Sequence, residues 1–213
     1  ETVIDLKSQS SKYFSRESGE WMSCPYLLAK KNNKWGVIDR NDNIHIPFKF
    51  EDIKYLPNSK GDFFAAKKNG YWGLINKEQK VIIPFRFSGI SYFNDLLTNY
   101  FKVETESYLY GYIDTAGVIT CEPKFRKAMP FCNHFARVKD KQDRWRFINR
   151  RYEFISDRHF EEIRDFHNGL AAFKKGKYWG FVDTTGQTIV EPQYRKAGDF
   201  SDGIAYVRMR TKK

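Results

Sequence analysis

The sequence contains little cysteine and no long hydrophobic run. Its three cysteines, Cys24, Cys121 and Cys132, leave at least one thiol unpaired, and none stands in a Cys-x-x-Cys or Cys/His spacing suited to zinc. No apolar segment approaches the roughly 20 residues of a transmembrane helix, and none of the signal-peptide kind opens the chain. We therefore expect a soluble protein without a membrane span, with the cytoplasm slightly favoured over secretion or surface attachment.

Residue patterns typical of catalysis are also missing. The four histidines share no spacing with acids or cysteines that suggests a metal site or a nucleophile, and there is no glycine-rich phosphate loop. His45 takes a position held elsewhere by Ile82 and Cys121, so we interpret it as a partly buried side chain. We predict no catalytic residue, no metal and no cofactor. An enzyme whose site lies on loops is the least favoured alternative.

What the sequence does contain is a repeat. An aromatic residue followed in four of five cases by glycine recurs at intervals of 37, 38, 35 and 34 residues, at Trp35-Gly36, Trp72-Gly73, Tyr110-Gly111, Trp145-Arg146 and Trp179-Gly180. A fixed period of this size indicates a tandem repeat architecture. The 41% hydrophobic content, with 19 Phe and 13 Tyr, is ample for a buried core.

Each repeat has the pattern of a short β-meander. Two aromatic or aliphatic runs flank a turn such as Asn69-Gly70, which favours the positive φ angles of a type I′ hairpin. A second turn leads to a third apolar run that contains a proline, for example Pro47. Because proline has no N–H, this third strand is predicted to lie at a sheet edge or to end there.

These patterns predict an all-β fold of five tandem three-stranded antiparallel β-meander repeats of about 34–38 residues. The predicted organisation is a polar tail or cap at 1–24, a repeat domain at 25–207 with units at about 26–54, 62–92, 100–130, 135–165 and 169–199 and a capping strand at 200–207, and a basic tail at 208–213. A longer surface loop is expected around Asn94 to Asn99. We favour an open, twisted array, with a β-propeller as the alternative, because propeller blades usually hold four strands.

The repeated residues have structural explanations. The aromatic column, Trp35, Trp72, Tyr110, Trp145 and Trp179, is expected to fill the space between units, and the glycine after it allows a close approach of neighbouring backbone. Asp39, Asn76, Asp114, Asn149 and Asp183 follow the aromatic by four residues and are expected to accept backbone hydrogen bonds in the next turn.

The repeated pattern, [Trp/Tyr]-Gly-x-[Ile/Val]-[Asp/Asn] followed by a turn, an apolar run and Pro-x-[Phe/Tyr], resembles that of the bacterial WG-repeat family. The resemblance covers roughly residues 26 to 207, and Tyr110 and Arg146 depart from it. It implies tandem β-meanders that serve as binding or scaffold modules, and it provides no catalytic residues to assign.

The basic charge is concentrated in one stretch. Residues 124–151 carry ten Lys or Arg against two Asp, within a chain of net charge +11. We predict Lys124, Arg126, Lys127, Arg144, Arg146, Arg150 and Arg151 as candidate binding residues. Arginine beside exposed aromatic rings can bind phosphates and stack on bases. In the alternative interpretation the rings point inward and the cations form a solvated face.

The sequence therefore predicts a non-catalytic binding or scaffold module that recognises a protein or a cell-surface polymer through its repeat surface. The alternative is a module that binds an acidic polymer or nucleic acid through the basic fourth repeat. The sequence does not predict an oligomeric state.

Overall fold

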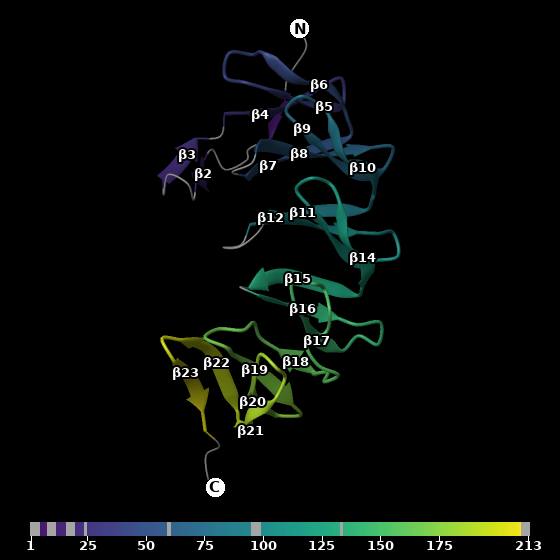
Figure 1. Ribbon diagram of the computed structural model, residues 1–213. Coiled ribbons are helices and arrows are strands. Elements are labelled where there is room, and N and C mark those ends of the chain that lie inside the picture. The colour runs from purple at the N-terminus through teal and green to yellow at the C-terminus, as the bar shows by residue number, and fades with distance from the viewer. Residues whose placement is uncertain are drawn as a thin grey trace. The chain divides into compact units, whose positions relative to one another are not determined.

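The computed structural model describes residues 5–7, 12–15, 20–23, 25–58, 61–94, 99–132 and 134–209. These residues form antiparallel sheets joined by turns, and no helix occurs among them. The prediction of an all-β tandem repeat is confirmed, and none of the sheets in the described ranges closes on itself. Figure 1 shows the strands and their labels.

Five larger sheets follow one another along the chain. In sheet order, the first three are β1 (Asp5–Lys7), β4 (Leu27–Lys31), β5 (Lys34–Ile38) and β6 (Ile44–Phe50); β10 (Val81–Phe87), β9 (Tyr71–Asn76), β8 (Gly61–Lys68) and β7 (Asp52–Asn58); and β11 (Gly89–Asn94), β12 (Asn99–Glu104), β13 (Tyr110–Asp114) and β14 (Ile119–Phe125). The fourth and fifth are β15 (Lys127–Cys132), β16 (Phe135–Lys139) and β17 (Trp145–Ile148); and β18 (Glu162–Ile163), β19 (Leu170–Lys175), β20 (Tyr178–Asp183) and β21 (Thr188–Tyr194).

Two hairpins complete the described strands. β2 (Lys12–Ser15) pairs with β3 (Glu20–Ser23), and β22 (Lys196–Ser201) pairs with β23 (Ile204–Arg208). The chain divides into two compact units, and the boundary between them falls within the third sheet. The first unit contains the first two large sheets, and the second contains the fourth and fifth sheets with the β22–β23 hairpin.

The structure adds a strand to the predicted three-stranded meander. The segment that leads out of one repeat pairs with the first predicted strand of the next, as β7 pairs with β8 and β11 with β12. A single residue separates this added strand from the preceding sheet at Glu51, Ser88, Arg126 and Arg195. The predicted third strands β6, β10, β14 and β21 are sheet edges, as their prolines require.

Both faces of a sheet are buried in the first unit. Along β8, Phe64 and Ala66 belong to one core cluster, while Phe63 and Ala65 belong to another. This explains why the strand is a continuous apolar run rather than an alternating one. Trp35 packs in the cluster that includes residues of β7, and Trp72 in the cluster that includes residues of β11 and β12. Both are only 9% exposed, so the aromatic column fills inter-sheet space here as predicted.

The glycine after the aromatic lies against the third strand. A Cβ built on Gly36 would stand 2.6 Å from the carbonyl oxygen of Ile46, and one on Gly180 would stand 2.4 Å from that of Val190. Real Cβ atoms do not approach backbone this closely. The glycine therefore allows the third strand to pair with the second, and the pairing is irregular at this point.

The Asp/Asn column forms the predicted turns. The Oδ1 of Asp183 accepts hydrogen bonds from the backbone N–H groups of Thr185 and Gln187, each at 2.9 Å. Asp39, Asn76, Asp114 and Asn149 accept equivalent bonds from the residue four positions on. The Thr185 hydroxyl and these amides hold the pKa of Asp183 below its usual range. At the Asn69-Gly70 turn both residues have positive φ, as expected.

Several predicted segments lie partly outside the described residues. Within the polar segment 1–24, β1 adds a strand to the first sheet and β2 and β3 form a hairpin. The expected loop at 94–99 falls mostly on residues 95–98, which lie outside the described ranges, as does the basic tail beyond Met209. The predicted capping strand is β23, whose Ala205 and Val207 pack with Phe181 of the fifth sheet.

Candidate functional site

The fourth repeat lacks a regular third strand, and Arg146 occupies part of the resulting space. After β17 the chain makes only isolated bridges, Trp145 to Phe160 and Ile148 to Phe154. The Arg146 guanidinium lies 3.6 Å from the centroid of the Phe154 ring, and its Nη2 donates to the Ser156 carbonyl at 2.6 Å. The side chain is 14% exposed. Arginine can replace the repeat glycine here because residues 154–156, which lie beside this position, form no regular strand.

Two more of the predicted arginines are held by neighbouring side chains. Arg144 donates from Nε to Asp140 Oδ2 at 3.1 Å, within a turn where Asp140 also accepts two backbone hydrogen bonds. Burial raises the pKa of Asp140, but the hydrogen bonds from Arg144 and Gln142 outweigh it, so this pKa lies below its usual range. Arg150 lies 4.5 Å from the Phe131 ring centroid, and Arg151 is exposed.

The exposed cations gather where β15 meets the turn after β16. Arg126 and Lys127 are exposed, and Arg126 donates from Nε to the Lys141 carbonyl at 3.1 Å. Lys127 stands directly opposite Lys139 in the β15–β16 register. Lys139 is half-buried, and its Nζ pairs with Asp143 Oδ2 at 2.7 Å. We call Arg126, Lys127, Lys139 and Lys141 the fourth-repeat basic cluster. Lys124, also exposed, precedes it and lies 5.3 Å from the Phe125 ring centroid.

Trp145 is surrounded by cations rather than presented to solvent as a stacking platform. Lys127, Arg137 and Lys139 place their charged groups 5.8, 5.7 and 5.5 Å from its ring centroid. Arg137 is fixed by Asp165 through two bonds of 2.6 and 2.8 Å. Phe125, Phe131 and Phe147 are buried in the core. These positions match the interpretation in which the rings point inward and the cations form the solvated face.

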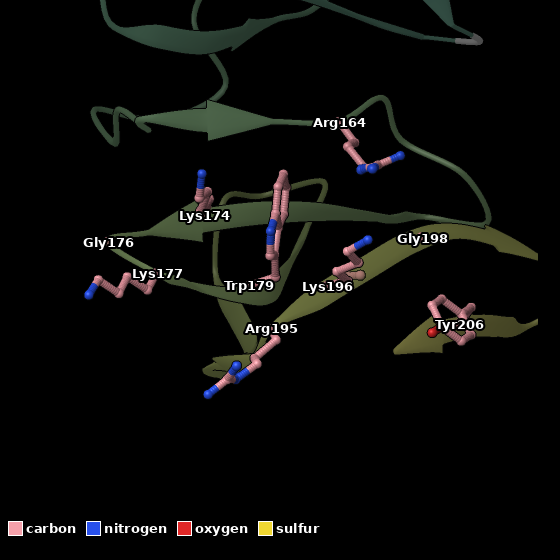
Figure 2. A pocket seen from close by; sticks show the side chains of 10 residues that line it. Arg164, Lys174, Gly176, Lys177, Trp179, Arg195, Lys196, Gly198 and Tyr206 are labelled. Carbon is pink, nitrogen blue, oxygen red and sulfur yellow. The ribbon is translucent and has the colours of Figure 1, made fainter. Parts of the chain in front are cut away.

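A second basic site, absent from the sequence predictions, lies between the fifth sheet and the β22–β23 hairpin. Five cations, Arg164, Lys174, Lys177, Arg195 and Lys196, line a cavity of about 680 Å³ with Trp179 and Tyr206. Figure 2 shows the Trp179 indole between Lys174 on one side and Arg164 and Lys196 on the other, with Lys177 and Arg195 extending outward. We call this cavity the terminal pocket.

A comparison of equivalent repeat positions could have revealed the terminal pocket. The residue before the added strand and the first residue of that strand are both acidic in two sheets: Glu51-Asp52 in the second and Glu161-Glu162 in the fifth. The equivalent two residues are both basic in the fourth sheet, Arg126-Lys127, and in the β22–β23 hairpin, Arg195-Lys196. Residues 152–207 have a slightly negative net charge, with seven Lys or Arg against nine Asp or Glu. The total charge of this segment therefore gives no indication that basic residues gather at Arg195 and Lys196.

Among the described residues, no group of three His, Cys, Asp or Glu side chains is placed to hold a metal ion. Within the same ranges, no helix is long and apolar enough to cross a membrane. His45 is half-buried, with Nε2 3.2 Å from Asp39 Oδ2 and its ring against Tyr26. Burial raises the pKa of the Cys121 thiol.

The successive antiparallel sheets, the aromatic column and the glycine contacts define a tandem β-repeat protein. The chain belongs to the WG containing repeat family, whose profile matches residues 35–72, 72–95, 110–143, 145–179 and 179–212. These matches start at the aromatic positions Trp35, Trp72, Tyr110, Trp145 and Trp179.

Comparisons with whole proteins give weaker likenesses. No curated protein matches the chain. A solved structure of the Dos1 propeller aligns with a TM-score of 0.41 and 16% identity, over 86% of this chain and 61% of that one. A crystal structure of a protein of unknown function from Bacteroides caccae aligns with a TM-score of 0.31 and 10% identity, over 89% of this chain and 92% of that one.

Proposed function

We propose that this chain is a non-catalytic binding module whose fourth-repeat basic cluster recognises an acidic segment of another protein. The observation that carries the proposal is the placement of Lys127 directly opposite Lys139. Like charges at opposite positions of an antiparallel pair destabilise it, by roughly 0.2–1 kcal/mol for such pairs. The equivalent position of the second sheet holds the complementary pair Asp52 and Lys67. Asp143 pairs with Lys139 at 2.7 Å and compensates one of the two charges, so Lys127 is the charge that an anionic partner would offset in the fourth repeat.

The aromatic contacts favour a protein over a nucleic acid as the partner. Base stacking requires an open ring face, whereas Trp145 has three cations around it and Phe125, Phe131 and Phe147 are buried. The exposed Phe154 ring is covered by the Arg146 guanidinium, 3.6 Å from its centroid. The cluster therefore offers charge without a stacking surface. Carboxylates of an acidic peptide need only the charge.

The test measures binding of two probes by fluorescence anisotropy at about 50 mM salt: a labelled peptide of ten glutamates and a single-stranded oligonucleotide of similar charge. The test variant is Arg126→Glu with Lys127→Glu, and the matched control is Arg195→Glu with Lys196→Glu. The two variants alter equivalent structural positions and lower the net charge of the chain by the same amount. We expect the fourth-repeat variant to weaken peptide binding at least tenfold and the control to leave it within about twofold.

Folding can be checked in the same samples. Lys127→Glu places an acid opposite Lys139, as in the second sheet, so the variant is expected to be as stable as the wild type or more so. Equal weakening by both double variants would indicate non-specific attraction and contradict the proposal. Tighter binding of the oligonucleotide than of the peptide, lost in the fourth-repeat variant, would assign the cluster to nucleic acid instead.

A further inference from the structure

The terminal pocket has an excess of positive charge. Its five cations lie near three carboxylates: Asp199 lies 3.6 Å from Arg164, Glu162 pairs with Lys174, and Glu161 accepts a hydrogen bond from the amide of Gly176, which lines the cavity. Lys177, Arg195 and Lys196 form no ion pair with any of the described residues. These three unpaired cations come from the hairpin turn before β20, the link before β22 and β22 itself, and the pocket has a net charge of about +2 when the three carboxylates are counted.

Two of these charges replace acids found at equivalent places. In the fifth sheet, Glu161 accepts a hydrogen bond from the Gly176 amide at 3.0 Å, and Glu162 stands opposite Lys174. In the hairpin these two positions are Arg195 and Lys196, and Lys196 stands opposite Arg208. Two acids have thus become two bases, and one of them, Lys196, forms a like-charge pair with Arg208. An anion bound in the pocket would compensate the charge of Lys196, which lines it.

The indole of Trp179 organises the cations. Arg164 Cζ lies 5.4 Å and Lys174 Nζ lies 5.9 Å from the ring centroid, within the range of cation–π attraction. The ring thus positions two charges at the cavity wall. Tyr206, which is 68% exposed, adds a phenol to the cavity lining.

The size and charge density of the pocket define its ligand. A volume of about 680 Å³ falls in the range of small-molecule sites, roughly 300–1,000 Å³. Side chains on one face of an extended acidic peptide recur only every two residues, about 6.6 Å apart, so a peptide would bring few carboxylates into this volume. Adjacent phosphate groups concentrate more charge, and the planar guanidinium group is suited to paired phosphate oxygens.

We propose that the terminal pocket binds a linear polyphosphate group, either free or as part of a nucleoside triphosphate. Arg164, Lys174 and Lys196 contact the chain of phosphates beside Trp179, and Lys177 and Arg195 attract its charge at the cavity mouth. No bond is made or broken. This site is separate from the fourth-repeat basic cluster, and its ligand differs from the acidic protein segment proposed there.

The experiment is isothermal titration calorimetry of the whole chain with sodium tripolyphosphate, ATP without divalent cations, orthophosphate and the ten-glutamate peptide, at matched ionic strength. Binding of tripolyphosphate at least tenfold tighter than orthophosphate is expected. The variant Arg195→Glu with Lys196→Glu copies Glu161-Glu162 of the fifth sheet, so it should fold normally and weaken tripolyphosphate binding at least tenfold. The matched variant Arg126→Glu with Lys127→Glu should leave it within about twofold.

The two possible sources of the phosphate chain are separated by the same titrations. Equal affinity for tripolyphosphate and ATP would identify the phosphate chain alone as the ligand. At least tenfold tighter binding of ATP, reduced by Tyr206→Ala, would show that the nucleoside is also contacted. The proposal is overturned if tripolyphosphate binds no tighter than orthophosphate, if both double variants lose it equally, or if the peptide binds this pocket more tightly.

Discussion

The fourth and fifth repeats show how one residue change is accommodated when the surrounding strand also changes. In the fifth repeat, Gly180 lies against β21, which leaves no room for a side chain. In the fourth repeat a regular third strand is missing, and Arg146 packs on Phe154 instead. The glycine is therefore a requirement of the third strand rather than of the aromatic before it. Where that strand is lost, the position is free to hold a large side chain.

The largest effect expected from this comparison concerns the aromatic column. Trp72 is 9% exposed and packs between sheets, so Trp72→Ala should lower the free energy of unfolding by about 3–5 kcal/mol through cavity formation. Trp179 is more exposed, and Trp179→Ala should lower it by about half as much or less. Urea titrations of the two variants measure the difference. Equal losses would contradict the role of burial and would favour a closed ring of repeats over the open array.

The glycine position should give the next largest effect. Gly180→Ala places a methyl group 2.4 Å from the Val190 carbonyl oxygen, so β21 must move, and we expect a loss of about 2–3 kcal/mol. Arg146→Ala in the fourth repeat introduces the same residue without that clash. It removes one hydrogen bond and a ring contact and should cost about 1–2 kcal/mol. The hydrogen-exchange rate of the β21 amides should rise in Gly180→Ala but not in Arg146→Ala. A larger loss of unfolding free energy in Arg146→Ala than in Gly180→Ala would contradict the conclusion that the third strand requires the glycine.

The smallest effect is expected in the turn after β20, where Asp183 accepts backbone hydrogen bonds. Asp183→Ala removes the acceptor for Thr185 and Gln187 and should lower the melting temperature slightly, whereas Asp183→Asn keeps an oxygen acceptor and should lower it less. Because the folded-state pKa is lowered, the charged Asp183 contributes stability above its unfolded pKa, and this contribution is lost as pH falls through the folded pKa. Thermal unfolding between pH 7 and pH 2 tests both statements. The two variants should differ near neutral pH, and identical melting temperatures there would argue against the hydrogen bonds.

The parts of the fold that could be predicted are those with local causes. Asn69-Gly70 specifies its own turn, Pro47 excludes a central strand, and the aromatic period marks the repeats. The added strand β7 was not predicted, although Ile53 and Tyr55 alternate with polar residues and are buried. An isolated alternating segment does not indicate which neighbouring sheet it joins. That choice depends on pairing with β8, which is a tertiary contact.

The candidate sites could likewise be predicted only where they depend on local sequence. The concentration of basic residues at 124–151 is visible in the sequence, but the burial of Arg146 depends on the missing third strand, which no local pattern encodes. The terminal pocket required comparison of equivalent positions. The replacement of Glu161 and Glu162 by Arg195 and Lys196 at equivalent positions can be recognised only once the strand register is known.

The single-residue link between sheets also bears on how such chains can be shortened or extended. Because β7, β11, β15 and β22 each start one residue after the preceding third strand, the smallest segment that removes a complete sheet runs from such a link to the next third strand, as from Glu51 to Phe87. A deletion from one Trp-Gly to the next would instead join half of one sheet to half of another. Gene duplication or protein engineering that respects the link would leave every remaining sheet with its full set of hydrogen bonds.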